Sequence, residues 1–190
     1  MKLFLANGFV GTSVKDLTDA VGIARGTLYW HFSSKDQILD EIFNRYSEQF
    51  VDGAIKAMKR CEGDFVTRFH ALYRFITEFA RDNRELLLVF DTLLGEISRN
   101  GTDAANKMKE IRSRLRISIG ELLRTGQKEG AVAGDIDTDL HAHIIIATFT
   151  GMLLEWFLYE ESLDAVAYSR AFRQAILSGL PGERGDGGRE

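Results

Sequence analysis

Proline and cysteine are almost absent from this chain: its 190 residues include one proline, Pro181, and one cysteine, Cys61. Because proline interrupts helices, its near absence leaves long stretches free to form them. A single cysteine excludes an intramolecular disulfide, which is typical of proteins in a reducing compartment. No run shows the strict polar and apolar alternation of a half-buried strand. The composition therefore predicts an all-helical fold.

Patterns typical of catalytic or metal sites are equally scarce. The sequence has no Gly-rich phosphate loop, no nucleophile elbow and no Cys-x-x-Cys pair. His141 and His143 are two residues apart, so they point to different sides of a helix, and His70 has no carboxylate at ligand spacing. We therefore expect no catalytic residue, no metal ligand and no cofactor.

Long apolar runs are also missing. The most apolar stretch, residues 144–154, has eleven residues and is followed by Glu155, whereas a bilayer span needs about 20. No signal peptide is evident at the N-terminus. These observations predict a soluble, cytoplasmic protein without a membrane partner.

Residues 12–39 contain the most informative pattern, two short helices joined by a turn. Thr12 or Ser13 is the expected N-cap, and Ser13 and Asp16 have the spacing of a capping box, so a helix is expected to begin near Val14. Gly22 is expected to end it, because glycine adopts the left-handed C-terminal conformation without steric cost. This layout predicts a helix-turn-helix, which places its second helix in the major groove of DNA.

Both short helices have an apolar side and a polar side. The apolar positions expected to be buried are Val14, Leu17, Val21, Ile23, Leu28 and Phe32. The opposite side of the second helix has residue types that suit DNA: arginine for guanine edges or phosphate, threonine for a thymine methyl, tyrosine and histidine for phosphate oxygens. Trp30 fits either the aromatic core of a small domain or the DNA surface. The expected DNA-binding residues are Arg25, Gly26, Thr27, Tyr29, Trp30, His31 and Lys35.

Four segments of this region, GTSV at 11–14, VGI at 21–23, GTLYWHF at 26–32 and KD at 35–36, resemble the tetracycline-repressor (TetR) family of bacterial regulators. The resemblance implies that Thr27, Tyr29, His31 and Lys35 contact DNA, mostly its backbone. Arg25 and Gly26 are then the candidates for reading bases. The family usually has a full first helix with a basic arm before it, whereas residues 1–7 provide about two turns, so contacts from such an arm cannot be assigned.

Two further features of this region affect DNA binding. Ala24 occupies a position where Ser or Thr often caps the second helix, and this could cost about 1 kcal/mol of local stability. The net charge of −4 lies outside residues 1–45, where five basic side chains balance five acidic ones. We therefore expect modest non-specific affinity with a clear salt dependence.

Helical periodicity continues through the rest of the chain. The expected helices are residues 35–61, 65–79, 82–94, 103–128, 138–159 and 163–178, with a turn at Asn100-Gly101, which makes nine helices with the first three. The expected domains are a DNA-binding domain at 1–45, a ligand-binding and dimerisation domain at 46–180, and a disordered tail at 181–190.

The helix expected at 138–159 is apolar around its whole axis, so it needs cover on every side. A second copy of the chain could supply that cover, and Gly151 would allow close approach of the two copies. A central position in a monomeric bundle is the alternative. The family resemblance implies the dimer, and a dimer would read an inverted-repeat operator.

Aromatic and thioether side chains in the second half could line an apolar pocket, although such residues are more often plain core. The candidate ligand-binding residues are Phe69, Tyr73, Phe90, Met108, Phe149, Met152 and Trp156. Residues 151–156, GMLLEW, resemble drug-efflux repressors of the AcrR type, which implies bulky hydrophobic effectors. The sequence therefore predicts a dimeric repressor that a small hydrophobic molecule releases from DNA. The alternatives are an effector-independent regulator controlled by a protein partner, and an enzyme or ligand carrier on a helical scaffold.

Overall fold

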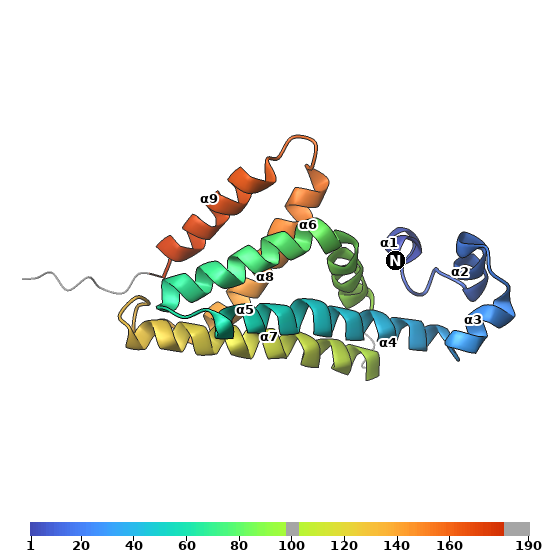
Figure 1. Cartoon of the computed structure of the whole chain (residues 1–190), viewed down its shortest axis with the longest axis horizontal. Helices are drawn as coiled ribbons and strands as arrows, with labels where there is room; N and C mark the ends of the chain where they lie inside the picture. Colours follow the sequence, from blue (N-terminus) through green and yellow to red (C-terminus); the bar gives the residue numbers. More distant parts are fainter. Residues whose placement is uncertain (98–102, 181–190) are drawn as a thin grey trace, which may run out of the picture. The chain divides into compact units, whose positions relative to one another are not determined.

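The computed structural model describes residues 1–97 and 103–180, and within them the regular secondary structure is helical, without strands (Figure 1). The predicted all-helical fold is confirmed. The elements are α1 (Lys2–Asn7), α2 (Val14–Val21), α3 (Arg25–His31), α4 (Lys35–Arg45), η1 (Tyr46–Val51), α5 (Asp52–Arg60), α6 (Phe65–Ile97), α7 (Asp103–Lys128), α8 (Thr138–Leu158) and α9 (Ala165–Ser178).

One of the expected helices differs from the structure in its type. Residues 35–60 are helical throughout, but the middle segment η1 is a π-helix rather than an α-helix. The break expected near residue 82 is confirmed, because α6 consists of two helical segments that meet across a kink at Asn83, whose backbone is not helical (φ −131°, ψ 30°). Asp82, the expected start of the second helix, lies directly before the kink and pairs with the neighbouring Arg81 at 2.9 Å. The predicted Asn100-Gly101 turn and the tail at 181–190 lie outside the described residues.

The described residues form two compact units. Unit 1 comprises the described residues of 1–51 and 80–112, and unit 2 comprises those of 52–79 and 113–180. Helices α6 and α7 each contribute residues to both units. The predicted domain boundary at residue 45 stays a prediction.

An aromatic pair forms part of the core of unit 1. The ring of Tyr46, from η1, stacks on Phe90 of α6 with 3.6 Å between centroids and 4° between planes. Beside it, Arg112 donates a hydrogen bond to Asp91 at 2.9 Å. Burial raises the pKa of the Asp91 carboxyl above its ordinary value, although Arg112 acts in the opposite direction. The core of unit 1 therefore contains a largely desolvated ion pair.

Helix α8 in unit 2 is buried along one side only. Its buried residues are Thr138, Ala142, Ile145, Phe149, Met152 and Leu153. The whole helix has 21 residues and a window of mean hydropathy 1.3, so length and composition alone would let it cross a membrane, unlike the eleven-residue stretch considered from the sequence. The core helix of a soluble protein passes the same test, so this is weak support for a membrane span.

Candidate DNA-binding surface

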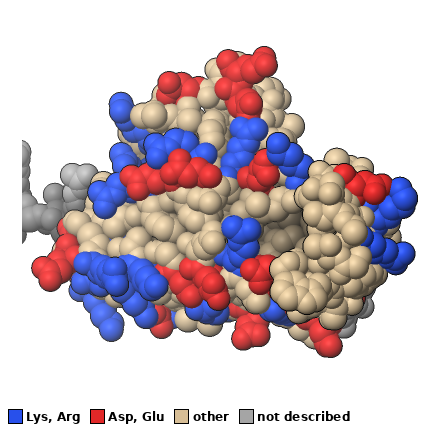
Figure 2. All heavy atoms as spheres, turned by 45° about the vertical axis from the view of Figure 1, so that its right-hand side comes forward, with Lys and Arg blue, Asp and Glu red and all other residues tan. Residues whose placement is uncertain are grey.

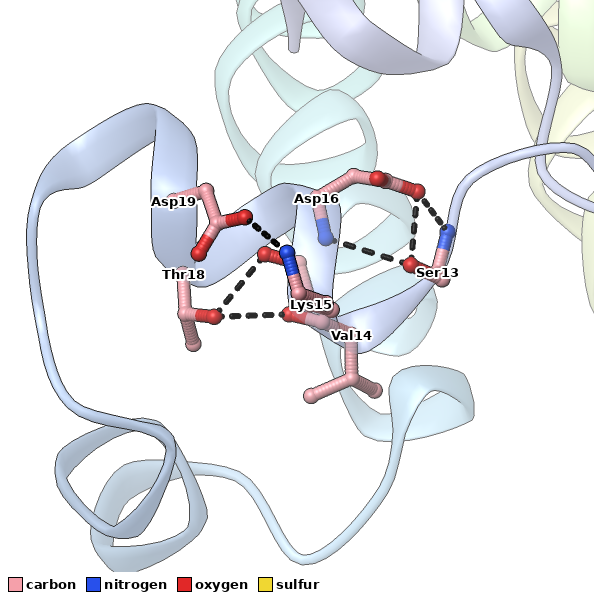
Figure 3. A network of polar contacts seen from close by, with 6 residues as sticks. All are labelled: Ser13, Val14, Lys15, Asp16, Thr18 and Asp19. Carbon is pink, nitrogen blue, oxygen red and sulfur yellow. Dashed lines mark hydrogen bonds and ion pairs between the residues drawn. The ribbon is translucent and has the colours of Figure 1, made fainter.

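Helix α2 begins and ends as its sequence predicts. Figure 3 shows the polar contacts at its start. The Ser13 hydroxyl accepts a hydrogen bond from the Asp16 backbone N–H at 3.1 Å, and the Asp16 carboxylate accepts one from the Ser13 N–H at 2.8 Å. The Ser13 hydroxyl also donates to the Asp16 carboxylate at 2.6 Å, and this bond, together with the one from the Ser13 N–H, lowers the pKa of Asp16. Gly22 ends the helix in the left-handed conformation (φ 67°, ψ 31°). The capping box and the glycine cap are both confirmed.

Helix α3 has no buried residue. As expected, its N-cap residue Ala24 makes no side-chain capping bond. Trp30 is 82% exposed, which excludes the core alternative for this side chain within the chain itself. The Arg25 guanidinium lies 5.5 Å from the Tyr29 ring centroid and donates a hydrogen bond to its hydroxyl at 3.3 Å. All six candidate residues on α3, residues 25–27 and 29–31, are accessible to a ligand outside the chain.

The apolar side of the helix-turn-helix is only partly buried. Leu17 and Phe32 are half-buried, but Val21 is 65% exposed, so the prediction that it is buried is wrong. Ile23 is exposed as well. Helix α1 has six residues and one buried side chain, Phe4, and so offers little apolar surface to cover α2.

Two threonines whose burial sequence reasoning missed lie in this region. Thr12 is fully buried and its hydroxyl donates to the carbonyls of Gly8 at 2.6 Å and Leu3 at 3.3 Å. Thr18 is buried and donates to the Lys15 carbonyl at 2.9 Å. Each hydroxyl donates hydrogen bonds to nearby backbone carbonyls. The spacing of apolar residues in the sequence does not reveal that such a threonine is buried.

Lys35 was expected to contact DNA, and its ammonium group already has partners within the chain. It donates to the backbone carbonyls of Phe9 at 2.7 Å and Thr12 at 3.0 Å. An ammonium group has three N–H donors, so one is left for a phosphate oxygen. The Glu96 carboxylate of α6 binds the same turn through the N–H groups of Phe9 and Val10, both at 2.7 Å. No local sequence signal could have found Glu96, because it lies 87 residues from Phe9.

The candidate ligand-binding residues fall in both compact units, and no observation tests their role. Phe90 and Met108 are fully buried in unit 1, where Phe90 stacks on Tyr46. The other five belong to unit 2 and are Phe69, Tyr73, Phe149, Met152 and Trp156.

Tyr73 is at the centre of an aromatic group in unit 2, which we call the Tyr73 cluster (Tyr73, Phe149, Met152 and Phe172). The Tyr73 ring centroid lies 5.8 Å from that of Phe149 and 6.0 Å from that of Phe172. The Tyr73 hydroxyl donates to the Ser169 carbonyl at 2.6 Å and lies 3.2 Å from the Met152 sulfur. Burial raises the pKa of Tyr73. Phe172 from α9 was not among the predicted ligand residues.

Charged side chains of both signs are mixed on the face drawn in Figure 2, with uncharged areas between them. Several basic residues are paired with acids, among them Lys107 with Asp40 at 2.8 Å and Lys15 with Asp19 at 2.7 Å. Among the described residues, no group of three or more His, Cys, Asp or Glu side chains could hold a metal ion. The arrangement suits a few placed contacts to DNA rather than a broad basic surface.

Comparison with known proteins agrees with this description. The family model for bacterial regulatory proteins of the tetR family matches residues 1–42. The HTH-type transcriptional repressor KstR2 of Mycolicibacterium smegmatis is 25% identical over 97% of this chain and 88% of its own length. FadR from Bacillus subtilis, solved in complex with stearoyl-CoA, is 20% identical, with a TM-score of 0.76 over 94% of both chains.

A solved structure with higher identity shows the family. The TetR family transcriptional regulator PfmR from Thermus thermophilus is 31% identical and has a TM-score of 0.71, with 94% of each chain covered. The family consists of transcriptional regulators rather than enzymes. With a helix-turn-helix whose second helix is exposed and a match over nearly its whole length, the chain belongs to the TetR family of bacterial regulatory proteins.

Proposed function

We propose that this protein is a homodimeric transcriptional repressor that binds an inverted-repeat operator and is released by a small hydrophobic effector. The observation that carries the proposal is the exposure of α3, a helix without a buried residue whose side chains suit phosphates and base edges. The proposed DNA contacts are Thr27, Tyr29, His31 and Lys35 to the backbone, with Arg25 and Gly26 at base edges and Trp30 beside them. An operator-binding protein works beside the chromosome, so we place it in the cytoplasm.

The outer side of α8 supports the dimer. Successive residues of a helix are rotated by about 100°, so one stripe of α8 lies opposite its buried side. We call it the outer stripe of α8; its residues, all exposed, are Leu140, Ile144, Ala147, Gly151, Leu154 and Leu158. A Cβ atom built on Gly151 would meet no other atom within 4 Å, so nothing within the chain requires a glycine there.

A second copy of the chain is the proposed cover for this stripe. Helix α9 also has no buried residue, so both helices of the α8–α9 pair have uncovered surface. Large uncovered apolar surface is uncommon on a monomeric protein and typical of an interface. Two copies related by a two-fold axis would present two α3 helices to half-sites about 10 base pairs apart.

The effector proposal rests on the side chains around Tyr73. The Tyr73 cluster offers aromatic and thioether surface with one hydroxyl, which suits an apolar molecule with a polar group. One structural relative, FadR from Bacillus subtilis, was solved with stearoyl-CoA, a molecule of that description. We therefore propose an effector with a long apolar part, bound by residues that include Phe69, Tyr73, Phe149, Met152 and Trp156.

A selection experiment tests this function. The wild-type protein is mixed with a random duplex library, and the recovered DNA is sequenced and then titrated in gel shifts with and without acyl-CoA thioesters. We expect an inverted repeat that is released by long-chain thioesters and not by free coenzyme A. If none of the acyl-CoA thioesters releases the protein from the DNA, the alternative of a regulator controlled by a protein partner is favoured. Recovery of no preferred duplex would contradict the proposed function itself.

A further inference from the structure

The turn between α1 and α2, residues 8–12, is held by two charged side chains that come from other helices. Glu96 of α6 accepts one hydrogen bond on each carboxylate oxygen, from the backbone N–H groups of Phe9 and Val10 at 2.7 Å. Lys35 of α4 donates to the carbonyls of Phe9 and Thr12, and its ammonium lies 4.3 Å from the Phe9 ring centroid. Both polar groups of the Phe9 backbone are therefore bound by charged side chains, and such bonds are stronger than those between neutral groups.

The backbone of the turn is shaped for the Glu96 carboxylate. Gly8 has a positive φ of 70°, a conformation that side-chain-bearing residues rarely adopt. A Cβ atom at Gly8 would lie 2.9 Å from a Glu96 oxygen, closer than such atoms normally approach. The glycine thus allows both the conformation that turns two successive N–H groups toward one point and the space for the carboxylate.

The same turn leads directly into α2. Thr12 is fully buried, and Ser13, the next residue, is the N-cap of α2. A shift of the turn would therefore displace the start of α2 and, through the Gly22 turn, α3. All of these residues, including Glu96 and Lys35, belong to unit 1.

We propose that Glu96 is a positioning residue for DNA binding, which acts by clamping the 8–12 turn and so fixing the orientation of α2 and α3. The inference rests on the proposed DNA-binding function and adds a residue that contacts no DNA. Glu96 lies on the segment of α6 that follows the kink at Asn83. The clamp therefore links α6 to the helix-turn-helix directly, apart from the connection through α4.

The test compares three variants with the wild-type protein. Glu96→Ala removes both acceptors, and Glu96→Gln keeps one oxygen that can accept a hydrogen bond. Glu85→Ala is the matched control, a carboxylate on the same helix that forms a loose 4.0 Å ion pair with exposed Lys2. Affinity is measured by fluorescence anisotropy on the duplex that the wild-type protein selects and on an unrelated duplex of equal length.

For Glu96→Ala we expect about a tenfold weaker affinity for the selected duplex, with little change on the unrelated one, because misplaced helices lose the contacts that depend on register. Glu96→Gln is expected to fall between Glu96→Ala and the wild-type protein, and Glu85→Ala to match the wild-type protein. Unchanged affinity in a folded Glu96→Ala variant would overturn the proposal. Equal losses in Glu96→Gln and Glu96→Ala would also do so, since partial rescue is what a carboxylate clamp requires.

Amide hydrogen exchange tests the clamp without DNA. In Glu96→Ala the amides of Phe9 and Val10 should exchange about tenfold faster, while the Gly22 amide, bonded to the Asp19 carbonyl, should not change. Uniformly faster exchange at all three amides would mean general destabilisation and would overturn a local clamp. If the wild-type protein selects no duplex but these amides respond as expected, the proposed function fails while the clamp itself is supported. If Glu96→Ala does not fold, the same amides are measured in Glu96→Gln.

Discussion

Helix α3 and the outer stripe of α8 are both uncovered in the single chain, and they differ in chemistry. Helix α3 exposes Arg25, Thr27, Tyr29 and His31, whereas the stripe on α8 exposes leucine, isoleucine, alanine and glycine. Hydrogen-bonding side chains suit DNA, a charged partner whose interfaces retain water molecules. Aliphatic side chains suit a protein–protein interface from which water is excluded. Exposure makes both surfaces candidate binding sites, and their side-chain chemistry is the reason why we propose DNA for one and a second copy of the chain for the other.

The largest expected effect comes from placing charges in the aliphatic surface. Ile144→Glu with Leu158→Glu would bury carboxylates in the proposed dimer contact, which is strongly unfavourable for unpaired charges. We expect monomers of 21.4 kDa in sedimentation velocity and about a 1,000-fold loss of affinity for the selected duplex. Val66→Glu, at a partly exposed position on α6, is the control and should leave the dimer intact. A double variant that stays dimeric would refute the assignment of this surface.

Removing the polar groups of the other surface should separate DNA binding from dimer formation. Tyr29→Ala with His31→Ala removes two proposed phosphate contacts per chain, and we expect about a 100-fold weaker affinity, since each lost bond is worth roughly tenfold. The sedimentation coefficient should not change, because neither side chain is buried. Lys109→Ala, an exposed site on α7, is the control. Unaltered affinity in the double variant would contradict the role of α3.

A third change leaves both surfaces intact and alters the interior. Asp91→Ala removes the acceptor of the bond from Arg112, and we expect a loss of about 2 kcal/mol in the free energy of unfolding. Asp91→Asn should change it by less, within about 1 kcal/mol at neutral pH, because the amide still accepts a bond. Urea denaturation measures both. If Asp91→Ala and Asp91→Asn lose equal stability, the hydrogen bond from Arg112 does not account for the contribution of the Asp91 carboxylate to stability.

The pH dependence of the same pair has a definite sign. Burial raises the pKa of Asp91 above its ordinary 3.8, so the folded chain holds this proton more tightly than the unfolded chain. The stabilisation that comes from this bound proton is complete below pH 3.8, and it is lost as the pH rises through the raised pKa of Asp91. The stability of wild-type protein relative to Asp91→Asn should therefore fall as the pH rises through that window. An increase over the same range would show that Arg112 outweighs burial.

The smallest effects come from two glycines that flank the start of α3. Gly22→Ala forces a side chain into the left-handed region, and we expect a loss of about 1 kcal/mol in stability. Gly26→Ala meets no atom within 4 Å and should raise stability by a few tenths to about 1 kcal/mol, since alanine favours helices. Its DNA affinity should nevertheless fall, because Gly26 is proposed to lie at base edges and an added Cβ atom would keep the backbone farther from them. Thermal unfolding and anisotropy together distinguish the two positions.

Local features of the fold were predictable because they depend on neighbouring residues. The capping box of Ser13 and Asp16, the Gly22 cap and the uncapped start at Ala24 each involve residues within three positions of one another. The burial of Val21 was predicted wrongly, because periodicity identifies an apolar side without showing whether another helix covers it. The break near residue 82 was predicted from the sequence, and the structure has a kink at Asn83.

The residues of the candidate site likewise fall into those that the local sequence predicts and those that it does not. The exposed residues of α3 follow from the pattern of a helix-turn-helix, and Trp30, for which the sequence left two interpretations, is exposed. Glu96 could not be found, because its backbone partners Phe9 and Val10 lie 87 and 86 residues away in the sequence. The roles of the predicted ligand residues stay predictions.

The most direct test of the central claim is the composition of the protein–DNA complex. Native mass spectrometry of the wild-type protein with its selected inverted-repeat duplex should show two chains of 21.4 kDa per duplex, and a duplex with one half-site scrambled should bind much more weakly. A saturated complex with one chain per duplex, or equal binding to the scrambled duplex, would contradict a dimer that reads DNA with paired α3 helices.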